Sequence, residues 1–226
     1  MSVDRSDFEQ PASESSRRWY GVYPARVADN KDPEAQGRLR ILFEGQEYWA
    51  RLATLMAGNN RGSWFIPDVN DEVLIAFEDG DLRRPYVIGA LWNGFDRPPE
   101  SMDGPGSNNR QVLRSRNGVK ITLDDQDGQE QFIIETPGAQ KITLKDGPGS
   151  IVIEDSNGSS IKLESSGLTV TAPGKLTINA SIIEVGAGMV TVNAGTSKFS
   201  GVVQCDTLIS NSVISSSYSP GAGNIW

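Results

Sequence analysis

The side chains of this chain that could coordinate a metal ion are the carboxylates of one short acidic run. Asp124, Asp125 and Asp127 lie close together and are followed by Gly128, which resembles part of a calcium-binding loop. A calcium-binding loop has three acids at alternate positions and then a glycine, and Gly128 does not follow such a third acid. We therefore interpret the run as a solvated hairpin turn. We therefore expect no metal site here.

The residues that enzymes use most often for catalysis are scarce. The sequence has no histidine, which excludes a Ser-His triad, an imidazole base and a histidine metal ligand. Its one cysteine, Cys205, has no partner for an intrachain disulfide. Two glycine-rich stretches, 147–149 and 186–188, lack the spacing and the following Lys-Ser of a phosphate-binding loop. We predict that the protein is not an enzyme and has no catalytic residues and no cofactor.

The charge balance argues against two classes of binding protein. The chain has 21 basic and 29 acidic residues, a net charge of -8, which disfavours general binding to nucleic acid or to an anionic membrane. No apolar run approaches the length of a membrane span, and residues 1–16 contain no hydrophobic signal region. We expect the protein to be made in a cytoplasm and to bind no nucleic acid.

The elements that must carry these residues are short strands that recur between Val119 and Ala194. Each contains two apolar residues separated by one residue, beginning with Ile121 and Leu123. This spacing places both side chains on one face of a strand, and turn residues such as Asn157-Gly158 fill the gaps. We predict a repeat whose interior residues include Ile142, Leu144, Ile151, Ile153, Ile161, Leu163, Leu168, Val170, Leu176, Ile178, Ile183, Val185, Val190 and Val192.

One copy of this repeat has too few apolar side chains to offset the entropy cost of ordering its backbone. This shortfall favours strands that also pair with other copies, which predicts an intertwined homotrimer. Periodicity alone leaves open a single-chain triangular solenoid, in which three strands make one coil.

The chain divides into five segments by composition. Residues 1–18 are polar and form a predicted flexible arm, 19–94 contain separate strands with turns, and 95–109 form a short linker. Residues 110–218 are the predicted spike, and 219–226 are a C-terminal tip segment. The strands predicted in the second segment are Tyr20–Ala28, Arg38–Phe43, Tyr48–Thr54, Trp64–Ile66, Val73–Phe77 and Tyr86–Leu91. Five or six strands in so short a segment indicate a small closed barrel of the OB type.

Four sequence blocks resemble, in order and in spacing, the barrel of the central spikes of contractile injection machines. They are Gly37–Phe43, Trp49–Ala53, Phe65–Asp81 and Arg84–Gly94. That family includes phage baseplate assembly protein V, the T4-like cell-puncturing spike and the VgrG proteins of type VI secretion. The resemblance implies an all-β homotrimer, with an N-terminal OB-fold barrel followed by a C-terminal triple-stranded, intertwined β-helix.

The same resemblance implies function and partners. It predicts a structural spike attached through its barrel to the tail tube or hub protein and used to puncture the target-cell envelope. The leading setting is the baseplate of a phage tail, a virion assembled in the host cytoplasm. The alternatives are an extracellular contractile injection system or a type VI secretion system, in which the particle is secreted or stays in the cytoplasm.

Two departures from that family sharpen the expectation. Some relatives insert a lysozyme domain between barrel and rod, for which residues 95–109 are too few, and we predict no degradation of peptidoglycan. Other short spikes end in a histidine-x-histidine motif that holds iron, which this sequence lacks. We expect Ile225 and Trp226 to bind a PAAR-like tip protein. The alternative is that Trp226 folds back and fills the end of the trimer axis.

An alternative of a different class is an OB-fold module that binds oligosaccharide or single-stranded nucleic acid on a solenoid stalk. Such barrels combine basic grooves with stacking aromatic side chains. Arginines near Trp49 and Trp64 fit this description superficially, whereas acidic neighbours such as Glu47 and Glu72 weaken it. The arginines concerned are Arg38, Arg40, Arg51 and Arg61.

Overall fold

The computed structural model describes residues 18–217, and the secondary structure of this part is almost entirely β. The chain divides into two units, residues 1–176 and 177–226, and all the assigned strands belong to the first. No helix within the described residues has the length and apolar character needed to cross a bilayer. The expected all-β fold is confirmed.

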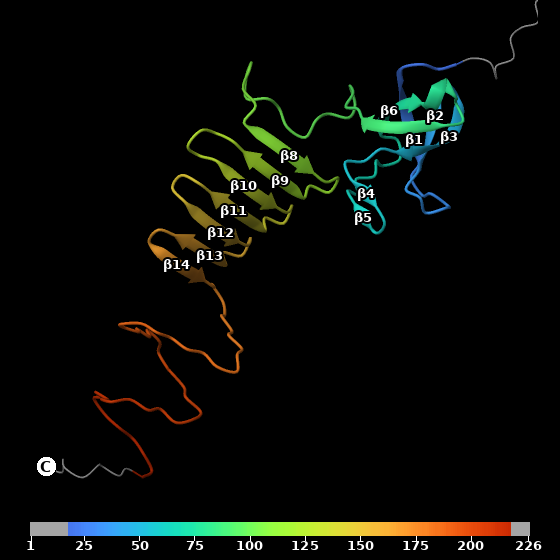
Figure 1. Cartoon of the computed structure of the whole chain (residues 1–226). Coiled ribbons are helices and arrows are strands. Elements are labelled where there is room, and N and C mark those ends of the chain that lie inside the picture. The colour runs from blue at the N-terminus through green and yellow to red at the C-terminus, as the bar shows by residue number, and fades with distance from the viewer. Residues whose placement is uncertain (1–17, 218–226) are drawn as a thin grey trace, which may run out of the picture. The chain divides into compact units, whose positions relative to one another are not determined.

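Five strands form a closed barrel in the order β1-β2-β3-β7-β6 (Figure 1). These strands are β1 (Val22–Asp29), β2 (Leu39–Phe43), β3 (Gln46–Leu52), β6 (Glu72–Phe77) and β7 (Pro85–Ala90). All neighbours pair antiparallel except β3 and β7, which pair in parallel. The OB-type barrel predicted from the sequence is confirmed.

The barrel is closed around apolar side chains from alternate positions of its strands. Val73, Ile75 and Phe77 of β6 point inward, as their spacing predicts, because alternate residues of a strand share one face. Phe43 and Phe77 form one end of the core with ring centroids 5.4 Å apart, and Trp19 packs edge-on against Phe43 at 5.1 Å. The largest fully buried side chains of the core are those of Val27, Leu39, Ile41, Val73, Ile75 and Val87.

The strand predicted at Trp64–Ile66 is wrong. The structure instead has a short hairpin of β4 (Ala57–Gly58) and β5 (Arg61–Gly62), in the stretch between the predicted strands Tyr48–Thr54 and Trp64–Ile66. The base of the hairpin is fixed where the Thr54 hydroxyl donates to the Ser63 carbonyl at 2.9 Å and the Ser63 N–H donates to the Met56 carbonyl at 2.9 Å. These local bonds fold the chain back before Trp64 and prevent a continuous strand.

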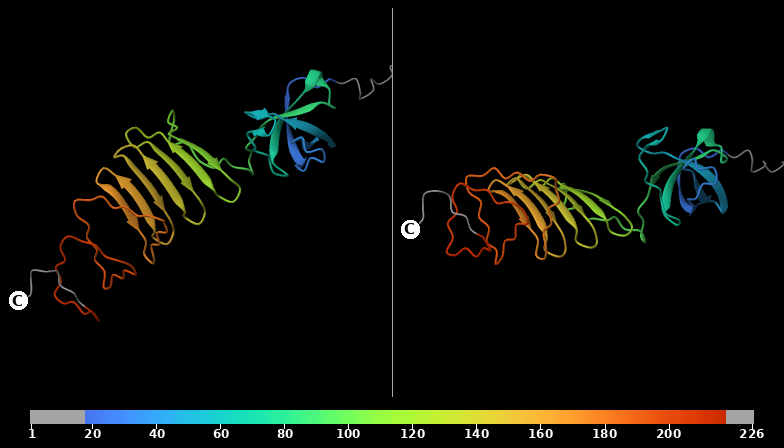
Figure 2. Two further views of the ribbon diagram at one scale, coloured as in Figure 1. Left: turned by 60° about the horizontal axis from the view of Figure 1, so that its bottom comes forward. Right: turned by 90° about the horizontal axis from the view of Figure 1, so that it is seen from below.

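Seven further strands form a second sheet in which each strand pairs antiparallel with the next along the chain. They are β8 (Arg110–Arg114), β9 (Lys120–Asp124), β10 (Gln131–Glu135), β11 (Lys141–Lys145), β12 (Ser150–Glu154), β13 (Ser160–Glu164) and β14 (Gly167–Thr171). Figure 2 shows this meander as a single layer. Because consecutive strands lie side by side, residues 110–171 do not form a solenoid of three strands per coil.

The predicted repeat and the observed strands agree from Ile121 to Val170 and differ beyond. The last three apolar pairs begin at Leu176, Ile183 and Val190, and none of them lies in an assigned strand. The apolar pairs therefore continue into residues 172–217, but this stretch pairs with no assigned strand of the same chain. At the other end, β8 is a strand that the repeat does not predict, and its Leu113 pairs with Ile121.

Candidate functional site

The register of the second sheet aligns the predicted interior residues in two rows on one face. Because directly paired residues share a face, Leu144 stands beside Phe132 and Ile151, and Ile142 beside Ile134 and Ile153. The first row is Leu123, Phe132, Leu144, Ile151, Leu163 and Leu168. The second row is Ile121, Ile134, Ile142, Ile153, Ile161 and Val170.

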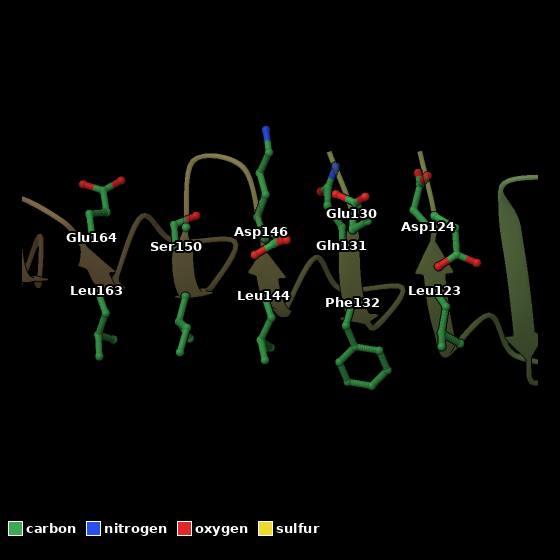
Figure 3. A pocket seen from close by; sticks show the side chains of 14 residues that line it. Leu123, Asp124, Glu130, Gln131, Phe132, Leu144, Asp146, Ser150, Leu163 and Glu164 are labelled. Atoms are coloured by element: carbon green, nitrogen blue, oxygen red, sulfur yellow. The ribbon is translucent and has the colours of Figure 1, made fainter. Parts of the chain in front are cut away.

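We call this surface the apolar face, and in a single chain it is largely uncovered. Ile142 is 36% exposed and Leu168 66% exposed, with most of the other members between them. In Figure 3, the side chains of Leu123, Phe132, Leu144 and Leu163 all point to the same side of the sheet. A contiguous apolar surface of this kind marks an interaction site, because soluble proteins rarely expose one.

The remaining predicted interior residues follow the sheet. Leu176, Ile178, Ile183, Val185, Val190 and Val192 are 59–70% exposed in the single chain. The structure does not join these residues to the two rows of the apolar face, and their place in an interior stays a prediction. Ile225 and Trp226, the predicted tip contact, lie outside the described residues.

The acidic run that resembles part of a calcium loop forms the turn between β9 and β10. The Asp124 carboxylate accepts the Gln126 N–H at 3.1 Å, and the Gln129 N–H donates to the Gln126 carbonyl at 2.8 Å. A depression of about 630 Å³ lies beside this turn and is lined by Asp124, Leu123 and Phe132 among others. Across residues 18–217, no three or more acidic or cysteine side chains are grouped in a way that could hold a metal ion.

Ion pairs attach the linker to the beginning of the sheet. The Arg110 guanidinium lies 2.8 Å from the Asp103 carboxylate, and the Lys120 ammonium lies 3.4 Å from Glu100. The hydrogen bond from Arg110 holds the pKa of Asp103 below its usual value, and the positive charge of Arg110 does the same for Glu100. The linker thus adds carboxylates that neutralise cations of the first two strands.

The arginines and aromatic residues of the barrel make contacts within the chain that conflict with a nucleic-acid groove. Trp49 is flanked by the guanidinium groups of Arg38 and Arg40, 5.5 and 5.7 Å from its ring centroid. Each of these arginines also lies within ion-pair distance of two carboxylates, Arg38 with Asp32 and Glu34, Arg40 with Asp29 and Glu47. A base would have to displace these partners to stack on Trp49.

Two family descriptions match separate parts of the chain. Residues 23–92 match the type VI secretion system/phage-baseplate injector OB domain, which here is the barrel. Residues 131–197 match the phage baseplate V C-terminal trimerisation domain, which contains β10 to β14 and most of the apolar face. The first match confirms the resemblance seen in the barrel sequence, and the second supports a homotrimer.

Several type VI secretion spike proteins are similar to part of this chain. VgrG1b of Pseudomonas aeruginosa is 28% identical over 124 residues, which cover 48% of this chain and 17% of that protein. VgrG4b of the same organism is 32% identical over 113 residues, 43% of this chain and 14% of that protein. VgrG3 of Vibrio cholerae is 28% identical over 112 residues, which cover 43% of this chain and 11% of that protein. The chain thus aligns with less than a fifth of the length of these relatives.

Proposed function

This chain belongs to the central-spike family of contractile injection machines, and from that premise we propose that three copies form a spike that punctures the target-cell envelope. The observation that carries the proposal is the uncovered apolar face, most of which lies within the segment matched to a trimerisation domain. Three copies could cover these faces by packing them toward a common axis. The apolar face would then become the interior of the spike.

The segment after the sheet supports contact between copies in a second way. No backbone-to-backbone hydrogen bond is present between residues 177 and 217, although apolar pairs continue along that stretch. Backbone groups that become buried need hydrogen-bond partners. In the proposed trimer the other two copies supply these partners, so residues 172–217 form the intertwined triple-stranded part and residues 110–171 form three sheets, one from each chain.

The proposed role is mechanical and non-catalytic. A closed barrel and a continuous ladder of strands suit a part that must transmit load without unfolding. We propose that the barrel attaches to the tube or hub protein, and that Ile225 and Trp226 bind a PAAR-like tip protein. The particle is a phage tail or a secretion machine, and the named type VI relatives support the second setting beside the first.

The mass of the purified full-length chain in solution tests this proposal. Light scattering should give three times the monomer mass of 24.5 kDa. In particles, loss of this chain should abolish delivery across the target envelope, and the wild-type chain should restore it. A monomer at all accessible concentrations would overturn the spike assignment.

A further inference from the structure

We propose that neighbouring copies are aligned by an ion-pair clasp between two turns of the second sheet. The basic turn, residues 114–120, joins β8 to β9, and the acidic turn, residues 124–131, joins β9 to β10. The acidic turn of one copy faces the basic turn of the next copy. This inference rests on the proposed trimer and identifies how its copies are orientated.

The two turns lie at opposite ends of the strands. Arg114 pairs with Lys120 at one end of the strands, and Arg110 pairs with Asp124 at the other end. The two turns share β9, with Lys120 at its first residue and Asp124 at its last, so they overlap at the level of that strand. At the level of β9, each copy therefore presents the basic turn at one strand end and the acidic turn at the other.

The charges of the two turns are opposite and unmixed. The basic turn has three cations and no carboxylate, whereas the acidic turn has four carboxylates and no cation. The cations are Arg114, Arg116 and Lys120, and the carboxylates are Asp124, Asp125, Asp127 and Glu130. In Figure 3 the Asp124 and Glu130 side chains lie on the opposite side of the sheet from Leu123 and Phe132, so closing the apolar faces leaves these carboxylates outside.

Three-fold symmetry determines which sides meet. In a closed ring of three identical copies, every contact joins two different surfaces, and closure allows no shift along the axis. The strand ends on one side of each sheet must then face the opposite strand ends of the neighbouring sheet at the same level. At the level of β9, the acidic turn of one copy is consequently brought to the basic turn of the next at all three corners, and never to another acidic turn.

The carboxylates of the acidic turn lie outside the ion pairs of the described residues, although Asp124 stands opposite Arg110 in the ladder. Among the described residues none of its four carboxylates makes an ion pair, and Arg114 of the basic turn makes none either. Arg116 and Lys120 already contact carboxylates, at 2.9 Å from Asp68 and 3.4 Å from Glu100. Charge complementarity of this kind guides orientation and register more than affinity, which suits a clasp that aligns copies before the apolar faces close.

Cross-linking the full-length chain tests the clasp directly. In a Cys205→Ser background, Arg114→Cys combined with Asp125→Cys should give covalent dimers and trimers on a denaturing gel after treatment with a short bifunctional maleimide. Each single variant should stay monomeric on that gel, because three-fold symmetry keeps like positions apart. Arg114→Cys with Lys162→Cys, in the middle of β13, is the matched control and should also stay monomeric.

A native trimer that gives only monomers with the Arg114→Cys/Asp125→Cys pair would overturn the clasp while leaving the spike assignment intact. A wild-type monomer would overturn both. As a second readout, Arg114→Glu should lower the melting temperature of the trimer more than Lys162→Glu, and added Asp125→Arg should restore it. If Arg114→Glu and Lys162→Glu lower the melting temperature equally, and Asp125→Arg does not restore it, the clasp is also contradicted.

Discussion

One carboxylate, that of Asp32, holds together the loop between β1 and β2. It accepts the Arg38 guanidinium at 2.9 Å and the backbone N–H groups of Glu34 and Gln36 at 3.0 and 2.8 Å. The hydrogen bond from Arg38 contributes most to a pKa of Asp32 that is well below its usual value. Since this bond also orients Arg38 beside Trp49, the loop and the barrel wall are connected through Asp32.

We expect Asp32→Asn to destabilise the barrel at neutral pH and to lose this effect in acid. Because folding lowers the pKa of Asp32, its ionised form stabilises the fold fully above the unfolded value of about 3.9, and this contribution decreases progressively as pH falls from there toward the lower folded pKa. Thermal unfolding of both proteins between pH 7 and pH 3 measures the difference.

The matched control for that experiment is Glu34→Gln. Glu34 lies 3.0 Å from Arg38 but is more exposed than Asp32, so its loss should cost less. A gap between wild type and Asp32→Asn that is as large at pH 3 as at pH 7 would show that shape, and not charge, is what the carboxylate supplies.

At the scale of the element, β13 offers a direct comparison of the two faces of the sheet. Leu163 belongs to the apolar face, and the adjacent Lys162 points to the opposite face. Leu163→Asp would place three carboxylates in the proposed interior, and each buried unpaired charge costs several kcal/mol. We therefore expect Leu163→Asp to abolish the trimer, measured by light scattering.

Lys162→Asp is the control for Leu163→Asp, because it introduces the same side chain one residue away on the exposed face. It should leave the trimer mass unchanged. If both variants assemble, or if both fail, the apolar face is not the contact between copies.

Alternation of apolar and polar residues was sufficient to predict most of the strands and which side chains share a face. It places Val73, Ile75 and Phe77 on one face of β6, which the structure buries in the barrel, and it correctly places Ile142 and Leu144 on one face of the sheet. It could not predict which strands pair, because period two specifies a face and says nothing about the neighbour. That is why the antiparallel meander of residues 110–171 was not foreseen.

Other features of the fold carry no alternation of apolar and polar residues. β8 has only Leu113 and its neighbour Val112 as apolar residues, so it did not fit the pairs that define the repeat. The β4–β5 hairpin depends on hydrogen bonds of Thr54 and Ser63 and not on hydrophobic pattern. The contrast between the two charged turns was visible in the sequence, but it has meaning only once the register places them on opposite sides.

At the scale of the whole molecule, the proposed contact with a tip protein can be separated from assembly. Removal of residues 219–226, which include Ile225 and Trp226, leaves every assigned strand and the stretch 172–217 in place. The truncated chain should keep the trimer mass by light scattering and should lose the tip protein from purified particles. If the truncated trimer retains the tip protein as well as the full-length chain does, the docking surface lies elsewhere.

The meander also has a consequence for how a spike is made. Every strand from β8 to β14 pairs with its neighbour in the sequence, so each ladder closes over a short loop, and contacts of this local kind form quickly. In the proposed trimer, the strand pairs of this sheet need no second chain, whereas the stretch that follows finds its hydrogen-bond partners only in two other chains. Pairing within the sheet can therefore begin before the proposed winding of three chains, which proceeds at a rate that depends on concentration. During that interval the apolar face is open to aggregation, which gives an advantage to synthesis of many copies close together.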